Sequence, residues 1–222
     1  MENKDKINVI MREDNYYDNM NIILLPKNIF DIEGYSSRNI DNTSLIDEYI
    51  RQSMSGVQNG TAIELFINYG FTRALVSTLN VIFEKKLDCG IHIYNDDIHD
   101  YMEFGRLKKY NKINKATDNT FAASFQLINR KWKKTLEASV QPVFSGGQID
   151  VSHMFDADYM NQIAYDVLKD YAGKKVYLYI TGLKQALIAC VNAARELDIQ
   201  MTLKHYNPDD ESYEHIQNLY IG

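Results

Sequence analysis

Two stretches of this chain share one sequence pattern. When the stretch that begins at Gly70 is laid without gaps on the stretch that begins at Gly182, nine of 32 positions are identical. The identities include Asn80 with Asn192, and they extend to Tyr101 with Tyr213. Repeated units build pseudo-symmetric molecules, whose binding sites commonly lie at the axis between the halves. The repeat therefore predicts a duplicated fold with a site shared by both copies.

The apolar pattern predicts the same order of strands and helices in both copies. In the first copy we expect strands at 22–25, 62–67 and 90–94, helices at 45–54 and 71–86, and a turn at 95–97. In the second copy we expect strands at 139–144, 175–180 and 199–206, helices at 159–171 and from the turn at 181–182 to about 197, and a returning strand at 213–216. The predicted fold class is α/β: internally duplicated β-α-β-α-β units that form a Rossmann-like, mostly parallel sheet or a pseudo-dimer, with helices on both faces.

The predicted organisation has four parts. An N-terminal extension covers 1–20, the first α/β repeat 21–105, a basic connecting segment 106–137, and the second repeat 138–222. Between Arg106 and Leu136 there are nine basic residues and one acidic residue, on a chain whose net charge is −6. We expect a basic surface there, made by Lys108, Lys109, Arg130, Lys131, Lys133 and Lys134.

The connecting segment also has the spacing of an amphipathic helix. Cap residues at 117–119 precede apolar residues at helical intervals, namely Phe121, Phe125, Ile128, Trp132 and Leu136. We interpret it as a crossover helix that packs its aromatic stripe on the sheet. A helix that binds nucleic acid or a membrane surface is the alternative.

Composition limits the class of protein. With 45% apolar and 24% charged residues, the chain has the composition of a globular protein. We expect a cytoplasmic location and no membrane partner, because neither a signal-peptide pattern nor a long apolar run is present. Cys89 and Cys190 are not equivalent in the two copies and are expected to be packing residues. The abundance of Asn, Ile, Lys and Tyr suggests an AT-rich genome, such as that of a bacterium, a phage or another mobile element.

The candidate binding residues lie where each central strand passes into its helix. Unpaired N–H groups and the helix dipole attract anions at such corners, and a nearby cation strengthens the attraction. Alternatively, the glycines only permit a tight turn. We predict an anion site made by Asn68, Gly70, Thr72 and Arg73 in the first copy, and by Thr181, Gly182 and Lys184 in the second.

One of these corners has a resemblance to a known family. The segment Tyr-Ile-Thr-Gly-Leu-Lys-Gln-Ala-Leu at 179–187 resembles the strand-turn-helix motif of CRISPR-associated Rossmann-fold (CARF) domains. In that family a Thr-Gly-Gly-Thr-Lys-type turn follows a core strand, whereas this chain has one glycine at the turn. The resemblance implies that Thr181, Gly182 and Lys184 recognise a phosphate-linked nucleotide, such as a cyclic oligonucleotide.

Other repeated residues have structural interpretations. Asn80 and Asn192 are expected to contact each other across the pseudo-symmetry axis, with a ligand contact as the alternative. Tyr94-Asn95 and Tyr206-Asn207 begin hairpin turns, where Asn is favoured for local backbone reasons. The five histidines form no metal-binding spacing, and no Walker loop, dinucleotide fingerprint or hydrolase elbow is present. We therefore predict no metal and no cofactor, and we assign no catalytic residue.

These features favour a binding or sensing protein over an enzyme. The predicted ligand is small and anionic, a nucleotide or a cyclic oligonucleotide, held between two pseudo-symmetric halves. One alternative is a phosphodiester-cleaving enzyme that uses Arg73 or Lys184 to stabilise developing charge. The other is a structural or DNA-associating protein of a phage or mobile element, which would use the basic segment. A homo-oligomer is a further partner that the repeat allows.

Overall fold

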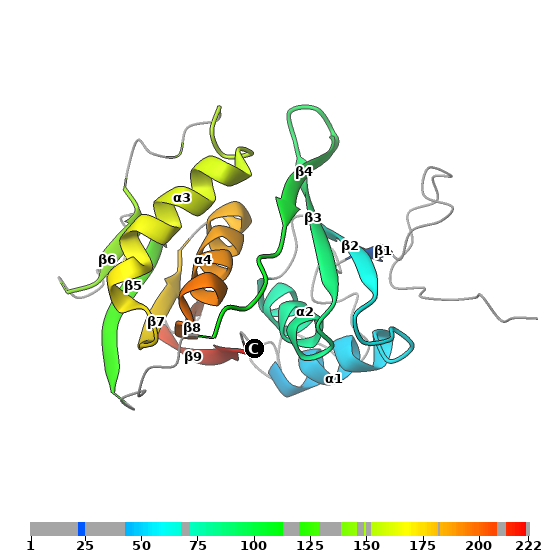
Figure 1. Cartoon of the computed structure of the whole chain (residues 1–222), viewed down its shortest axis with the longest axis horizontal. Helices are drawn as coiled ribbons and strands as arrows, with labels where there is room; N and C mark the ends of the chain where they lie inside the picture. The colour runs from blue at the N-terminus through cyan, green and yellow to red at the C-terminus, as the bar shows by residue number, and fades with distance from the viewer. Residues whose placement is uncertain are drawn as a thin grey trace, which may run out of the picture. The chain divides into compact units, whose positions relative to one another are not determined.

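A computed structural model describes residues 22–24, 43–67, 72–112, 120–128, 139–145, 149, 152–181, 183–207 and 212–220. The chain divides into two compact units, Met1–Arg106 and Leu107–Gly222 (Figure 1). Each unit is described by itself. The predicted N-terminal extension lies outside the described residues. None of the described helices is long and apolar enough to cross a membrane.

The first unit is a four-stranded sheet with two helices. Its elements are β1 (Ile22–Leu24), α1 (Thr43–Ser53), β2 (Ala62–Ile67), α2 (Thr72–Glu84), β3 (Asp88–Asn95) and β4 (Asp100–Arg106). The strand order is β1-β2-β3-β4, in which the first three strands are parallel and β4 returns as an antiparallel hairpin. The strands and helices predicted for the first copy are confirmed, and the hairpin extends the unit by one strand.

Side-chain alternation separates the two faces of this sheet. Ile63, Leu65 and Ile67 of β2 are fully buried, whereas Glu64 between them is partly exposed. The buried side chains belong to the core under α1 and α2, which pack against each other. One face of the sheet is therefore apolar and covered by helices. The other face carries the polar and aromatic side chains.

The second unit is a five-stranded sheet with two α-helices. Its elements are β5 (Phe121–Ile128), β6 (Gln141–Phe144), α3 (Ala157–Leu168), a 3₁₀ turn η2 (Lys169–Tyr171), β7 (Lys175–Ile180), α4 (Lys184–Leu197), β8 (Gln200–Asn207) and β9 (Ser212–Leu219). The strand order is β6-β5-β7-β8-β9, with only β9 antiparallel to its neighbour. The edge strand β6 contains Pro142, which lacks a backbone N–H and is tolerated at an edge.

The predicted amphipathic helix of the connecting segment is wrong for residues 121–128. This stretch is β5, which lies between β6 and β7 and pairs with both in parallel. Phe125 and Leu127 are fully buried, as expected of a strand with one face in the core. A helical period also fits Phe121, Phe125 and Ile128. The strand forms instead because β6 and β7 flank β5, so that the backbone N–H and C=O groups on both of its edges find partners. Residues 129–138, with Arg130, Lys131, Lys133 and Lys134, lie outside the described residues.

The prediction of helices on both faces is also wrong for the described elements. In each unit the two crossovers that contain a described α-helix advance in the same direction across the sheet, from β1 through β2 to β3 and from β6 through β7 to β8. The connection from β5 to β6 runs in the opposite direction, and its residues 129–138 lie outside the described residues. Because such connections are right-handed, both helices lie on the same face of their sheet. Figure 1 shows α3 and α4 side by side in front of the strands of the second unit, and the two helices pack together. The chain thus forms two mixed α/β units, and in each unit the described helices lie on one face of the sheet.

The offset that aligns Gly70 with Gly182 also aligns the secondary structure. It pairs the first residues of α2 and α4, of β3 and β8, and of β4 and β9. After each helix the chain passes through a left-handed residue that is not glycine, Lys86 (φ 53°) or Asp198 (φ 55°). The hydrogen bond from Gly60 N to Lys85 O, 2.9 Å, also has a counterpart, from Gly173 N to Leu197 O, 2.9 Å. The same local geometry therefore recurs in both units.

The position of β5 in the core predicts a stability difference between two phenylalanines of this strand. Phe125 is 1% exposed and packs edge-on against Tyr171, whereas Phe121 is 40% exposed. We expect Phe125→Ala to lower the free energy of unfolding by about 3–5 kcal/mol, and Phe121→Ala by about 1 kcal/mol or less. Urea unfolding followed by circular dichroism measures both values. Equal losses would contradict the assignment of Phe125 to the core.

Candidate functional site

The predicted corners lie at the carboxyl ends of the central parallel strands. In the first unit β2 ends at Ile67 and α2 begins at Thr72, and in the second β7 ends at Ile180 and α4 begins at Lys184. This is the edge at which α/β sheets commonly bind ligands. Thr72, Arg73, Thr181 and Lys184 are described there. Asn68, Gly70 and Gly182 lie outside the described residues.

The N-terminus of α4 has no side-chain cap. Its N-cap residue is Leu183, whose side chain cannot accept a hydrogen bond, and its first turn contains no acidic residue. By contrast α3, which starts at the same edge of the sheet, is capped by Asp156: the carboxylate accepts a hydrogen bond of 3.0 Å from Tyr159 N. Asp158 adds a second negative charge to the first turn of α3. The dipole of α3 is therefore compensated by its own side chains, whereas α4 carries the cation Lys184 as its first residue.

The α2 helix begins in a similar way. Arg73 is its second residue, and no acidic residue lies in its first turn. The Arg73 side chain is 5% exposed, so this cation lies within the protein near the positive end of the helix dipole. Both corners therefore combine a helix N-terminus with a cation.

Thr181 has a structural role in the second corner. Its hydroxyl donates a hydrogen bond to the Ile128 carbonyl and accepts one from the Ile128 N–H, each at 3.0 Å. The residue is fully buried. These two bonds join the carboxyl end of β7 to the carboxyl end of β5. Because the single donor of the hydroxyl is already used, Thr181 supports the corner rather than offering its hydroxyl proton to a ligand.

Asn192 is buried in α4, where it joins three segments of the second unit. Its Nδ2 donates to Asn161 Oδ1 of α3 at 3.1 Å, and its Oδ1 accepts from Lys108 N at 2.9 Å. Asn80 occupies the corresponding position in α2 and is also buried. The predicted contact between Asn80 and Asn192 would join units that are described separately, and it stays a prediction. The same holds for a ligand shared by the two corners.

The first part of the basic segment is held along α4. Arg195 Nε donates to Lys108 O at 2.6 Å, and Tyr110 Oη donates to Asp198 Oδ1 at 2.6 Å. Desolvation and the bond to Asp198 raise the pKa of Tyr110 to about 12, and desolvation lowers the pKa of Arg195 to about 10. The side chains of Lys108 and Lys109 are exposed. Of the predicted basic surface, these two lysines are the described part.

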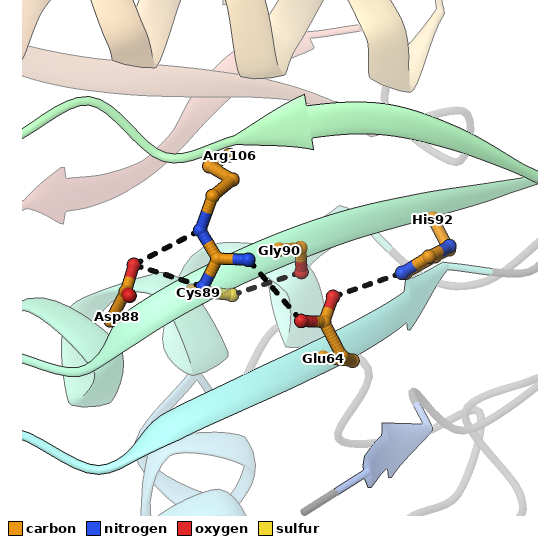
Figure 2. A network of polar contacts seen from close by, with 6 residues as sticks. All are labelled: Glu64, Asp88, Cys89, Gly90, His92 and Arg106. Atoms are coloured by element: carbon orange, nitrogen blue, oxygen red, sulfur yellow. Dashed lines mark hydrogen bonds and ion pairs between the residues drawn. The ribbon is translucent and has the colours of Figure 1, made fainter. Parts of the chain in front are cut away.

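The uncovered face of the first sheet holds a network of ionic contacts that the sequence did not predict (Figure 2). Glu64 of β2 accepts from Arg106 Nη1 of β4 at 3.3 Å, and its other oxygen lies 2.9 Å from His92 Nε2 of β3. Arg106 also binds Asp88, with Nε and Nη2 at 3.1 and 3.0 Å from Oδ1. The hydrogen bond to Asp88 is the main cause that raises the pKa of Arg106. The network joins three strands through one carboxylate.

Gly90 makes room for this carboxylate. A Cβ built on Gly90 would lie 1.9 Å from Glu64 Oε2, which is closer than two unbonded atoms can approach. Gly90 faces Glu64 in the register of β2 and β3. The glycine therefore allows the Glu64 side chain to lie across β3 and reach Arg106 and His92.

Aromatic rings cover the rest of this face, and the second sheet repeats them. His92 stacks on Phe66 with centroids 4.4 Å apart, and Tyr101 meets Phe66 edge-on at 5.1 Å and Tyr94 at 5.3 Å. In the second unit, Tyr213 meets Tyr179 at 5.1 Å and Tyr206 at 5.2 Å. Tyr94 and Tyr101 are the sequence equivalents of Tyr206 and Tyr213. These identities were a signal in the sequence, because strand alternation puts both tyrosines of each hairpin on one face.

The turn role predicted for Asn95 is confirmed, since its Oδ1 accepts a hydrogen bond from Asp97 N at 2.9 Å. Asn207 ends β8, and its side chain lies outside the described part.

The cysteines and possible metal ligands add no further chemistry. Cys89 and Cys190 are buried and free, and desolvation raises the pKa of both thiols, which fits the predicted packing role. Within the described ranges, no three His, Cys, Asp or Glu residues form a group that could hold a metal ion.

The contact between Gly90 and Glu64 predicts an energetic coupling. We expect Gly90→Ala to lower the free energy of unfolding by about 1–2 kcal/mol, because Glu64 must move and lose its ionic contacts. With Glu64→Ala already present, the same change should be neutral or stabilise by about 0.5 kcal/mol, since alanine is favoured over glycine in a strand. A double-mutant cycle by urea denaturation measures the coupling. Additive effects would contradict it.

The two hydrogen bonds of Thr181 predict that Thr181→Val is destabilising. The substitution keeps the shape but leaves the N–H and C=O of Ile128 without the hydroxyl, at an expected loss of about 1–3 kcal/mol. Thr181→Ser keeps the hydroxyl and should lose less. Thermal unfolding of the two variants tests the order, and a Ser variant less stable than the Val variant would refute the role assigned to this hydroxyl.

No protein-family model matches this chain, and no curated protein matches it in sequence.

Proposed function

We propose that this chain is a binding or sensing protein for a small anionic ligand, a nucleotide or a cyclic oligonucleotide. The ligand's phosphate groups would be held at the strand-to-helix corners. Arg73 and Lys184 would neutralise phosphate charge, and the first N–H groups of α2 and α4 would donate hydrogen bonds.

One observation carries the proposal. The α3 helix uses Asp156 and Asp158 to compensate its dipole, whereas α4 starts with Lys184, has no acid in its first turn and has no side-chain cap. The N–H groups at the start of α4 and the Lys184 side chain both favour a negative charge at this corner, and a bound phosphate would supply that charge. Local rules are commonly broken at functional sites. The α2 helix supports the same reading, because Arg73 lies in its first turn.

The ligand class is supported by the resemblance of the segment 179–187 to the turn of CARF domains. In this proposal Thr181 contributes by holding β5 against β7 through its bonds to Ile128. Gly182, which lies outside the described residues, would let a phosphate approach the backbone closely.

We further propose that the two units arose by duplication of one Rossmann-like unit. The proposal is supported by the aligned starts of α2 and α4, the left-handed residues Lys86 and Asp198, and the equivalent tyrosine pairs on β3–β4 and β8–β9. A duplicated origin would explain why both corners carry a cation.

The phosphodiester-cleaving enzyme and the DNA-associating protein remain sequence predictions. For the first, no nucleophile or general base was assigned at the corners. For the second, Lys108 and Lys109 are exposed, but β5 takes the place of the helix expected to carry the rest of the basic surface.

A thermal-shift screen tests the proposed function. The probes are ATP, cyclic dinucleotides, cyclic tetranucleotides and inorganic phosphate. A ligand at a hundred times its Kd stabilises the folded state by about 2.7 kcal/mol, so the melting temperature should rise by several degrees. Lys184→Gln should weaken binding about tenfold, because one charge-assisted contact is lost.

Lys169→Gln is the matched control, since it removes an equally charged side chain at the exposed end of the 3₁₀ turn. It should leave binding unchanged. Chromatography of the recovered ligand then separates binding from cleavage. The proposal fails if none of the probes shifts the melting temperature, or if Lys184→Gln and Lys169→Gln weaken binding equally.

A further inference from the structure

The uncovered face of the second sheet carries a row of aromatic rings around one cation. Phe121 of β5 stacks on Tyr177 of β7 with centroids 3.6 Å apart and planes at 11°. Lys204 Nζ of β8 lies 4.4 Å from the centre of the Tyr177 ring and 5.1 Å from that of Tyr179. The row continues through Tyr179 to Tyr213. Rings from β5, β7 and β9 and the cation from β8 thus form one surface.

Part of this surface is open to solvent. Phe121 is 40% exposed, and Ile216, which faces Lys204 in the register of β8 and β9, is 51% exposed. Both helices of the unit cover the other face of the sheet. The rings of Tyr177 and Tyr179 are only partly buried.

The charge of this surface suits an anionic partner. Lys204 Nζ donates a hydrogen bond of 3.3 Å to Tyr179 Oη, and none of its contacts among the described residues is with a carboxylate. The described side chains of the five strands include no carboxylate; the side chain of Glu214 in β9 lies outside this description. A cation held over aromatic rings without a carboxylate partner keeps its charge available to a phosphate.

A polar group within the row has no partner among the described residues. Tyr213 is 9% exposed, and its buried hydroxyl makes no hydrogen bond with any of them. Burial, together with Tyr206 and Tyr179, raises the pKa of this hydroxyl to about 12, so it stays uncharged.

The first sheet gives an internal comparison. His92 is the sequence equivalent of Lys204. Glu64 pairs with residue 90 and Tyr177 with residue 202, which is the equivalent of 90, so Glu64 occupies the place of Tyr177 and a carboxylate replaces a ring. Glu64 binds Arg106 and His92 within the sheet, and this satisfies the polar groups of that face. In the first unit the rings therefore lie beside a carboxylate that is paired with Arg106 and His92. In the second unit they lie beside the cation Lys204, which has no carboxylate partner among the described residues.

We propose that the ring surface of the second sheet, formed by Phe121, Tyr177, Tyr179, Lys204 and Tyr213, binds single-stranded nucleic acid. Unpaired bases would stack on the exposed rings, and Lys204 would contact a phosphate. Bases within a duplex are already stacked on each other, so exposed rings favour a single strand. This proposal does not depend on ligand binding at the corners.

Fluorescence anisotropy tests the proposal, with a labelled oligo-dT of about 12 nucleotides, within the usual site size of stacking surfaces, and a duplex of equal length as probes. The full chain should bind the single strand more tightly than the duplex. Tyr177→Ala removes the ring on which Phe121 stacks and over which Lys204 lies, so the exposed Phe121 ring and the cation both lose their position and binding should weaken at least about fivefold. Lys204→Gln should lower the slope of log affinity against log salt by about one.

Two controls keep the outcome interpretable. Tyr94→Ala removes a ring from the uncovered face of the first sheet, and Lys169→Gln removes an exposed charge elsewhere. Both variants should bind the oligonucleotide normally. Tyr177→Phe keeps the ring and should retain binding, which decides the matter if Tyr177→Ala does not fold.

The proposal is overturned by no rise in anisotropy, by equal affinity for the duplex, or by an equal loss in Tyr94→Ala. Sedimentation velocity tests whether a second copy of this chain occupies the aromatic surface instead. If Tyr177→Ala changes the oligomeric mass and the oligonucleotide does not bind, the surface is a contact between copies of this chain, and the proposal is wrong.

Discussion

The architecture of both units depends on the direction of their crossovers. Because β-α-β connections are right-handed, two successive crossovers in the same direction put both helices on one face of the sheet. That face is filled with apolar side chains, such as Leu65 and Ile91 in the first unit and Leu178 and Leu203 in the second. None of the described helices lies on the opposite face. Its polar groups must therefore be satisfied by each other, by water or by a partner.

The two uncovered faces meet this requirement in different ways. In the first unit Glu64 links Arg106 to His92, and Gly90 provides the space in which the carboxylate lies. In the second unit Tyr177 occupies the position of Glu64, and Lys204 has rings instead of a carboxylate beside it. Pairs of tyrosines lie at equivalent positions on both faces. The replacement of Glu64 by Tyr177 and of His92 by Lys204 thus separates a paired ionic network from a surface that can accept a ligand.

Most elements could be predicted from the sequence, because their apolar residues follow one clear period between turn residues. β5 could not, since Phe121, Phe125 and Ile128 fit a helical period and lie beside a run of basic residues typical of a solvated helix face. Its partners are β6 and β7, which are later in the sequence, and only this long-range pairing selects the strand. The side of the sheet on which the helices pack likewise depends on strand order, which the sequence pattern does not contain.

Glycines and cations in the sequence predict the corners as the site. The structure adds the hydrogen bonds of Thr181 and the capping state of each helix, which residue types alone do not give. Thr181 was a predicted ligand contact, yet its hydroxyl is used by both backbone groups of Ile128, because β5 ends beside it. The absence of a cap on α4 becomes informative only beside the capped α3. The tyrosine pairs were visible as repeated identities but were attributed to turns, since the hairpin partners β4 and β9 complete their surroundings.

Pro142 in β6 has a consequence for how this protein avoids aggregation. An edge strand offers its free backbone groups to any extended chain, and proteins protect such edges by shortening them or by removing donors. β6 is four residues long and one of these is Pro142, so a strand that added there would find a donor missing from a very short ladder. The missing N–H of Pro142 therefore disfavours the addition of further strands, and so fibre growth, at the β6 edge of the second sheet.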